Sequence, residues 1–260
     1  MWTLKAKRAE EHKEELLKEI KAFFDSKPYT IGTKTDPQTK RLIYYITKAD
    51  KVPDRIALIT GDIIQSLRST LDHLIYQLFI INSKDAKPTR HLYFPILENL
   101  AMYEKEKERK TKGISQSALD LIDKVKPYKG GNDILWKIHE LNNIDKHRLL
   151  VTVGSSFGSV DIGAHMQELM KASFPSFDTP EMPLFIKPAD ILFPLESGDE
   201  LFIDAPDAKP ISNMKFRFNL VLNEPGIVEG EPITDLIQSM TDEVENLITI
   251  FDEEAKGSNR

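Results

Sequence analysis

Five residues with the chemistry of binding or catalytic sites lie close together in one apolar segment: Arg68, Ser69, Asp72, His73 and Tyr76. An arginine guanidinium pairs with phosphate or carboxylate oxygens. A histidine exchanges a proton near neutral pH, because its ordinary pKa lies there. Most solvent-facing helices carry Lys and Glu instead, so this polar group indicates a site for binding or chemistry.

The segment that holds these residues, 54–82, is predicted to be a helix of about eight turns, because its apolar residues recur every three or four positions. One side carries a stripe formed by Leu67, Leu71, Leu74 and Leu78. The opposite side collects the polar residues Gln65, Arg68, Ser69, Asp72, His73 and Tyr76. Beyond Asp62 only Arg68 and Asp72 are acidic or basic, so we expect other parts of the protein to cover most of this helix. A buried charge needs a partner or a water-filled cleft, and such a cleft would be the site.

A purely structural interpretation of the same residues stays open. Arg68 and Asp72 lie four positions apart and can form an ion pair on one helix face. His73 would then donate or accept a hydrogen bond with a nearby backbone group. The order Arg before Asp is the less favourable one for such a pair on a helix, which counts slightly against this interpretation.

A second group of polar residues follows in the predicted helix 133–150, namely His139, Asn143, Lys146, His147 and Arg148. His139, Asn143 and His147 follow at steps of four and share a face. The two histidines are about 12 Å apart along the axis, too far to bind one metal ion. A metal would need His73 or Asp72 as well, and the spacing matches no standard zinc pattern, so we predict no metal site and no cofactor. The cationic side chains near residue 148 could equally stabilise the negative, C-terminal end of the dipole of this helix.

The composition limits the class of protein. The chain has 260 residues and no cysteine, which excludes disulfides, thiol nucleophiles and thiolate metal sites. Its first residues are charged and amphipathic, unlike a signal peptide, and no later run is long enough to span a bilayer, so a cytoplasmic protein without membrane contact is predicted. A net charge of −6 argues against broad nucleic-acid binding but leaves room for a local basic cleft.

The remaining periodicities predict a mixed α+β fold. Helices are expected at 3–25, 99–110, 115–125 and 233–254, and a β-hairpin at 29–31 and 41–47. Short strands are expected at 149–153, 185–187, 200–204 and 214–222. We therefore predict a helical bundle with a hairpin insertion in residues 1–150. An antiparallel sheet and a closing helix would follow in residues 151–260, packed on the bundle as one unit.

Three segments resemble an uncharacterised family of bacterial proteins: GDIIQSLRSTLDHLIYQL, YFPI and NNIDKHRLL. Within the first, Arg68 and His73 fit the Arg-x4-His motif of HEPN domains, which are helical bundles that include many RNases, and the resemblance covers about residues 54–150. It implies metal-independent RNA cleavage in a homodimer. His73 would take a proton from, or give one to, the ribose 2′-oxygen or the leaving 5′-oxygen, and Arg68 would stabilise the charge that develops on the phosphate. Asn143, Lys146, His147 or Arg148 would line the other wall of the cleft. RNA or a nucleotide is the partner that it implies.

Two functions therefore remain open at this stage. The first is a HEPN-like endoribonuclease or RNA-binding protein that uses Arg68 and His73, with Ser69, Asp72 and Tyr76 beside them. The second is a non-catalytic binding or regulatory module whose polar helix face makes structural hydrogen bonds. The enzyme requires Arg68 and His73 to reach one accessible cleft, whereas the binding module leaves them satisfied within the protein.

Overall fold

A computed structural model gives an α+β protein whose contacts divide the chain into two compact units. It describes residues 2–83, 87–148, 151–163, 166–167, 170, 183–188, 193–211 and 214–257. The helical unit comprises 1–19, 54–152 and 224–260, and the sheet unit comprises 20–53 and 153–223.

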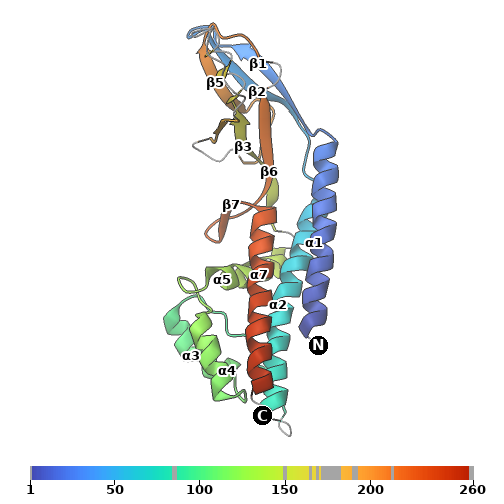
Figure 1. Ribbon diagram of the computed structural model, residues 1–260, viewed down its shortest axis with the longest axis vertical. Coiled ribbons are helices and arrows are strands. Elements are labelled where there is room, and N and C mark those ends of the chain that lie inside the picture. Colours follow the sequence, from blue (N-terminus) through green and yellow to red (C-terminus); the bar gives the residue numbers. More distant parts are fainter. Residues whose placement is uncertain are drawn as a thin grey trace. The chain divides into compact units, whose positions relative to one another are not determined.

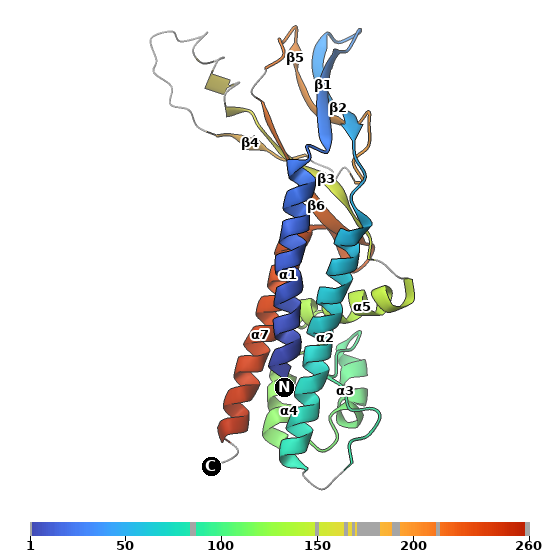
Figure 2. The ribbon, with the colours of Figure 1, turned by 90° about the vertical axis from the view of Figure 1, so that its right-hand side faces the viewer.

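The helical unit contains three long helices and three shorter ones among its described residues. They are α1 (Trp2–Asp25, up to residue 19), α2 (Asp54–Asn82), α3 (Leu100–Lys110), α4 (Gln116–Val125), α5 (Asp133–Arg148) and α7 (Ile233–Gly257), the last preceded by strand β7 (Val228–Pro232). The long helices α1, α2 and α7 run side by side, and α5 crosses them (Figures 1 and 2). This crossing places α5 against α2, with Gly61 of α2 close to Asp145 of α5.

The core of the helical unit forms around α2. Its stripe residues Leu67, Leu71 and Leu74 are almost completely buried, and so are Ile63 and Ile64. Short side chains begin the neighbouring helices as N-caps, in agreement with their sequence signals. The Asn99 and Ser115 side chains accept the backbone N–H groups of Met102 and Ala118, and the Asn132 side chain accepts that of Leu135 at the start of α5.

The sheet unit is built from antiparallel strands. They are β1 (Tyr29–Thr35), β2 (Arg41–Ala49), β3 (Val153–Asp161), β4 (Phe185–Ile186), β5 (Glu200–Pro206) and β6 (Lys215–Glu224). One sheet has the order β1-β2-β5, and in a second sheet β3 lies between β4 and β6. Ile46, Phe157, Val160 and Leu201 meet in one buried cluster, so this unit has its own apolar core.

The predicted fold class is confirmed: helices, an early hairpin, antiparallel sheets and a C-terminal helix are all present. The grouping of these elements differs from the predicted division at residue 150, because β2 pairs with the distant strand β5 and α7 packs on α2. The strand predicted at 149–153 begins only at Val153 in the described chain, and β7 was not predicted.

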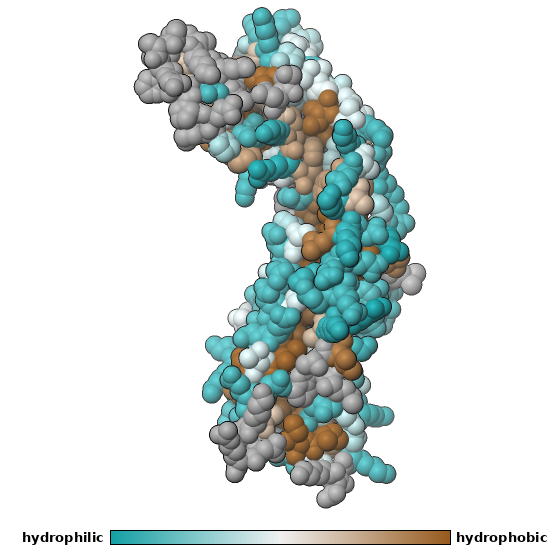
Figure 3. Space-filling view, turned by 45° about the vertical axis from the view of Figure 1, so that its right-hand side comes forward, coloured by the Kyte–Doolittle hydropathy of each residue, from teal (hydrophilic) through white to brown (hydrophobic). Residues whose placement is uncertain are grey.

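The surface is largely hydrophilic on the face drawn in Figure 3, with scattered apolar patches between charged side chains. Exposed apolar residues of the helical unit include Tyr76, Ile80 and Tyr93. Among the described helices, none has the length and apolar character needed to cross a membrane.

Candidate functional site

Arg68 and Asp72 of α2 hold the backbone of one residue from the YFPI segment. Arg68 is only 6% exposed, and its Nη2 donates a hydrogen bond to the carbonyl oxygen of Phe94 at 3.0 Å. The Oδ1 of Asp72 accepts the backbone N–H of Phe94 at 3.1 Å. The two side chains therefore satisfy both backbone polar groups of Phe94, whose own side chain is fully buried.

The same two side chains form an ion pair, as the structural interpretation predicted, but a buried one. Nη1 of Arg68 lies 2.7 Å from Oδ1 of Asp72. The N–H of Nη1 is not aligned with an acceptor, so the attraction at this atom is electrostatic rather than a directed hydrogen bond. Burial lowers the pKa of Arg68 and raises the pKa of Asp72, and each charge opposes the shift of the other. Arg68 stays protonated because an arginine pKa starts far above neutrality.

His139 of α5 is a neutral histidine in a positively charged environment. Burial lowers its pKa to about 3, and Arg68, Lys110 and Lys146 add to the effect by repelling a proton. Its Nε2 lies 3.3 Å from the side-chain Nδ2 of Asn143, an amide donor, so Nε2 accepts and the proton belongs on Nδ1. Nδ1 is buried and has no hydrogen-bond partner among the described residues.

Two lysines add positive charge near Arg68. Lys110, at the end of α3, is partly buried, and both burial and the charge of Arg68 lower its pKa. Its Nζ lies 5.9 Å from the centre of the Tyr93 ring. Lys146 of α5 is exposed. Neither lysine forms an ion pair with a carboxylate within the described chain.

We call Arg68, Asp72, Lys110, His139 and Lys146 the cationic cluster. It contains three positive side chains and one carboxylate, brought together from α2, α3 and α5. Sequence reasoning named its residues on α2 and α5 but missed Lys110, because the run EKEKERKTK resembles an ordinary solvated helix face.

The structure does not bring Arg68 and His73 together. They lie five residues apart on α2, which corresponds to about 140° around a helix. Arg68 points into the protein and is bonded to Phe94, whereas His73 is exposed and has no hydrogen bond or ion pair within the described residues. A cleft that both side chains share is therefore absent from the described part of one chain.

The other predicted site residues lie in different surroundings. Tyr76 and His147 are exposed, and Ser69 lines a pocket between α1 and α2. Asn143 contacts His139, as described above. The side chain of Arg148 lies outside the described part of the structure. Of the predicted residues, Arg68, Asp72, His139, Asn143 and Lys146 thus contribute to or border the cationic cluster.

Asp145 has a packing role where α5 crosses α2. A Cβ atom placed on Gly61 would lie 2.8 Å from Cγ of Asp145, so only glycine allows this approach without a shift. Burial and the charge of Asp62 raise the pKa of Asp145. Within the described residues, no three His, Asp or Glu side chains come close enough to hold a metal ion.

No family model, curated protein or solved structure matches the chain, so the function is inferred from the geometry of the site. The resemblance to HEPN domains therefore stays a prediction from the Arg-x4-His spacing. What the site itself offers is a cationic cluster, a buried neutral imidazole, and two side chains that bind the backbone of Phe94.

Proposed function

We propose that the helical unit is a non-catalytic module that binds a phosphate-bearing ligand, RNA or a nucleotide, at the cationic cluster. The observation that carries this proposal is Lys110, a partly buried cation beside Arg68 that forms no ion pair with a carboxylate among the described residues. Arg68 and Lys110 repel each other, Asp72 and Glu106 offset only part of that repulsion, and a bound anion would relieve the rest. Lys110 and Lys146 would supply positive charge to the ligand, and the buried Arg68 would add its field.

The chemistry of the cluster favours binding over cleavage. Metal-independent RNA cleavage needs an acid or base that titrates near neutral pH beside the phosphate. With a pKa of about 3, His139 holds no second proton to donate at pH 7. Arg68 is engaged by Phe94 and Asp72, and acts as a fixed positive charge within the cluster.

Binding can be tested with a labelled single-stranded RNA oligonucleotide and with a nucleotide, titrated at several salt concentrations. Lys110→Gln should weaken RNA binding and reduce the slope of log K against log salt by about 0.7, since one phosphate contact is lost. Lys105→Gln removes the same charge from an exposed position of the same helix and should leave the slope unchanged. Absence of RNA and nucleotide binding at low salt, or an equal loss of RNA affinity in both variants, would refute the proposal.

Cleavage is tested in the same preparation. Mixed RNA incubated with the protein in EDTA should stay intact, and His73→Ala should behave like the parent protein. If the parent cleaves RNA and His73→Ala does not, the predicted endoribonuclease replaces the binding module as the function.

A further inference from the structure

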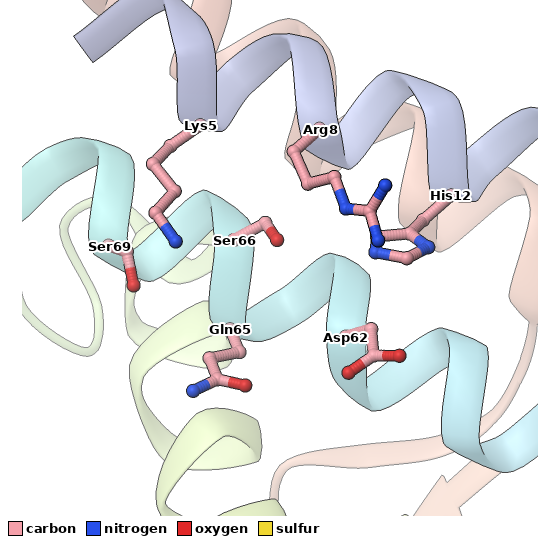
Figure 4. Close-up of a pocket in the computed structure, with 7 residues that line it drawn as sticks. All are labelled: Lys5, Arg8, His12, Asp62, Gln65, Ser66 and Ser69. Atoms are coloured by element: carbon pink, nitrogen blue, oxygen red, sulfur yellow. The ribbon is translucent and has the colours of Figure 1, made fainter. Parts of the chain in front are cut away.

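A polar pocket of about 260 Å³ lies between the first half of α1 and the middle of α2. Its walls are Lys5, Arg8 and His12 from α1, and Asp62, Gln65, Ser66 and Ser69 from α2. Figure 4 shows Lys5 and Arg8 extending from α1 toward α2, with the ammonium group of Lys5 directed at the stretch between Ser66 and Ser69. The pocket is separate from the cationic cluster, whose residues do not line it.

The position of these residues is unusual for two packed helices. Positions 5, 8 and 12 share one face of α1, and 62, 65, 66 and 69 share one face of α2, which is the spacing of a helix–helix contact. Apolar residues normally occupy such positions, and α1 does use Ala9 and Leu16 in the core. Polar side chains at the facing positions keep this part of the contact open to water and to a small polar ligand.

The donors in the pocket are not used within the protein. Thr60 and Thr70 of α2 direct their hydroxyl groups to the carbonyl oxygens of Ile56 and Ser66, four residues earlier. The hydroxyls of Ser66 and Ser69, by contrast, make no hydrogen bond within the described residues, and Lys5 makes no ion pair there. Two hydroxyl donors and a free ammonium group therefore converge on one space.

The charges of the pocket select the kind of ligand. Arg8 lies 3.4 Å from Glu11, so its charge is partly neutralised on α1 itself, and His12 lies 3.4 Å from Glu15. Lys5 has no such neighbour and keeps its full charge for a ligand. Asp62 lies seven residues before Ser69, about 10 Å along the axis of α2. Its carboxylate disfavours a second negative group at its own end of the pocket.

We propose that this pocket binds a small oxyanion, a phosphate or a carboxylate, between the ammonium group of Lys5 and the hydroxyls of Ser66 and Ser69, with Arg8 beside them. Charge-assisted hydrogen bonds from Lys5 supply most of the affinity, and the serine hydroxyls supply direction. The site belongs to a different helix pair from the cationic cluster, so it does not depend on the function proposed above.

Inorganic phosphate and acetate are the two probes, added separately while amide signals of Ser66 and Ser69 are followed by NMR. The protein carries Lys110→Gln and Lys146→Gln, so that phosphate bound at the cationic cluster does not contribute. Saturable shifts with phosphate, with acetate or with both support the pocket, and the stronger probe identifies the class of oxyanion. No saturable shift with either probe would overturn the proposal.

Charge variants then test the assignment of residues. Lys5→Gln should weaken binding about tenfold, as expected for a charge-assisted hydrogen bond. Asp62→Asn should strengthen binding severalfold, because it removes the opposing charge. Lys7→Gln is the matched control, since Lys7 is exposed on the same helix but does not line the pocket. Equal weakening by Lys5→Gln and Lys7→Gln would mean general surface attraction and would overturn the site.

Discussion

The guanidinium of Arg68 illustrates how burial changes the role of a side chain. Its Nη2 is bonded to the backbone of Phe94 and its Nη1 faces Asp72, so the group is positioned before any ligand arrives. A fixed charge of this kind loses little conformational entropy on binding. Its positive field acts on Lys110 and His139, whose pKa values it helps to lower.

His139 should make stability depend on pH in a defined direction. In the unfolded chain this histidine takes up a proton near pH 6.5, whereas the folded protein keeps it neutral down to pH about 3. The unfolded state therefore binds more protons between these values, and stability falls as pH drops through 6.5 toward 3. We expect His139→Gln to lose less stability than the parent protein between pH 7 and pH 5, measured by urea unfolding.

The comparison with the variant is needed because the titration of other groups changes stability with pH in the opposite direction. Asp72, Glu140 and Asp145 have raised pKa values, so the folded state binds more of their protons at acid pH. These contributions are shared by the parent protein and His139→Gln and cancel in the difference. Identical pH profiles for the two proteins would show that His139 is not held neutral by its surroundings.

Helix α2 shows how far an element can be predicted from its sequence. Its apolar period predicted residues 54–82, and the helix spans Asp54–Asn82. The identity of its neighbours could not be predicted, because period and composition do not say which segment covers which face. Asp72 therefore appeared as a surface partner of Arg68, whereas it also binds the backbone of Phe94.

The crossing of α5 over α2 can be tested at Gly61. Gly61→Ala should destabilise the protein by no more than about 1 kcal/mol, because the new Cβ meets the carboxylate end of Asp145, which can turn aside, and alanine favours the helix. In an Asp145→Ala background the obstacle is gone, and the same change should stabilise by up to about 1 kcal/mol through helix propensity. Urea unfolding of the four proteins gives the coupling free energy. An equal effect of Gly61→Ala in both backgrounds would contradict this packing.

At the scale of the whole molecule, the two units are assembled from segments that alternate along the chain. The sheet order β1-β2-β5 joins the early hairpin to a strand more than 150 residues later, for example Ile43 to Ile203. Local periodicity predicted each of these strands but contains no information about pairing over such a distance. The predicted boundary at residue 150 followed the order of the elements along the chain. The contacts between elements follow instead the pairing of strands that are distant in the sequence.

Separate cores should give the two units separate stabilities. Phe157 is 4% exposed in the core of the sheet unit, so Phe157→Ala should cost that unit about 3–5 kcal/mol. Both tryptophans, Trp2 and Trp136, fall in the helical unit, so fluorescence follows that unit alone during urea unfolding. We expect faster hydrogen exchange in β3 and β6 of the variant, with an unchanged fluorescence midpoint and unchanged RNA binding. A fluorescence midpoint that falls together with exchange protection would instead mean that the chain unfolds as one cooperative structure, in which the ligand sites depend on the sheets.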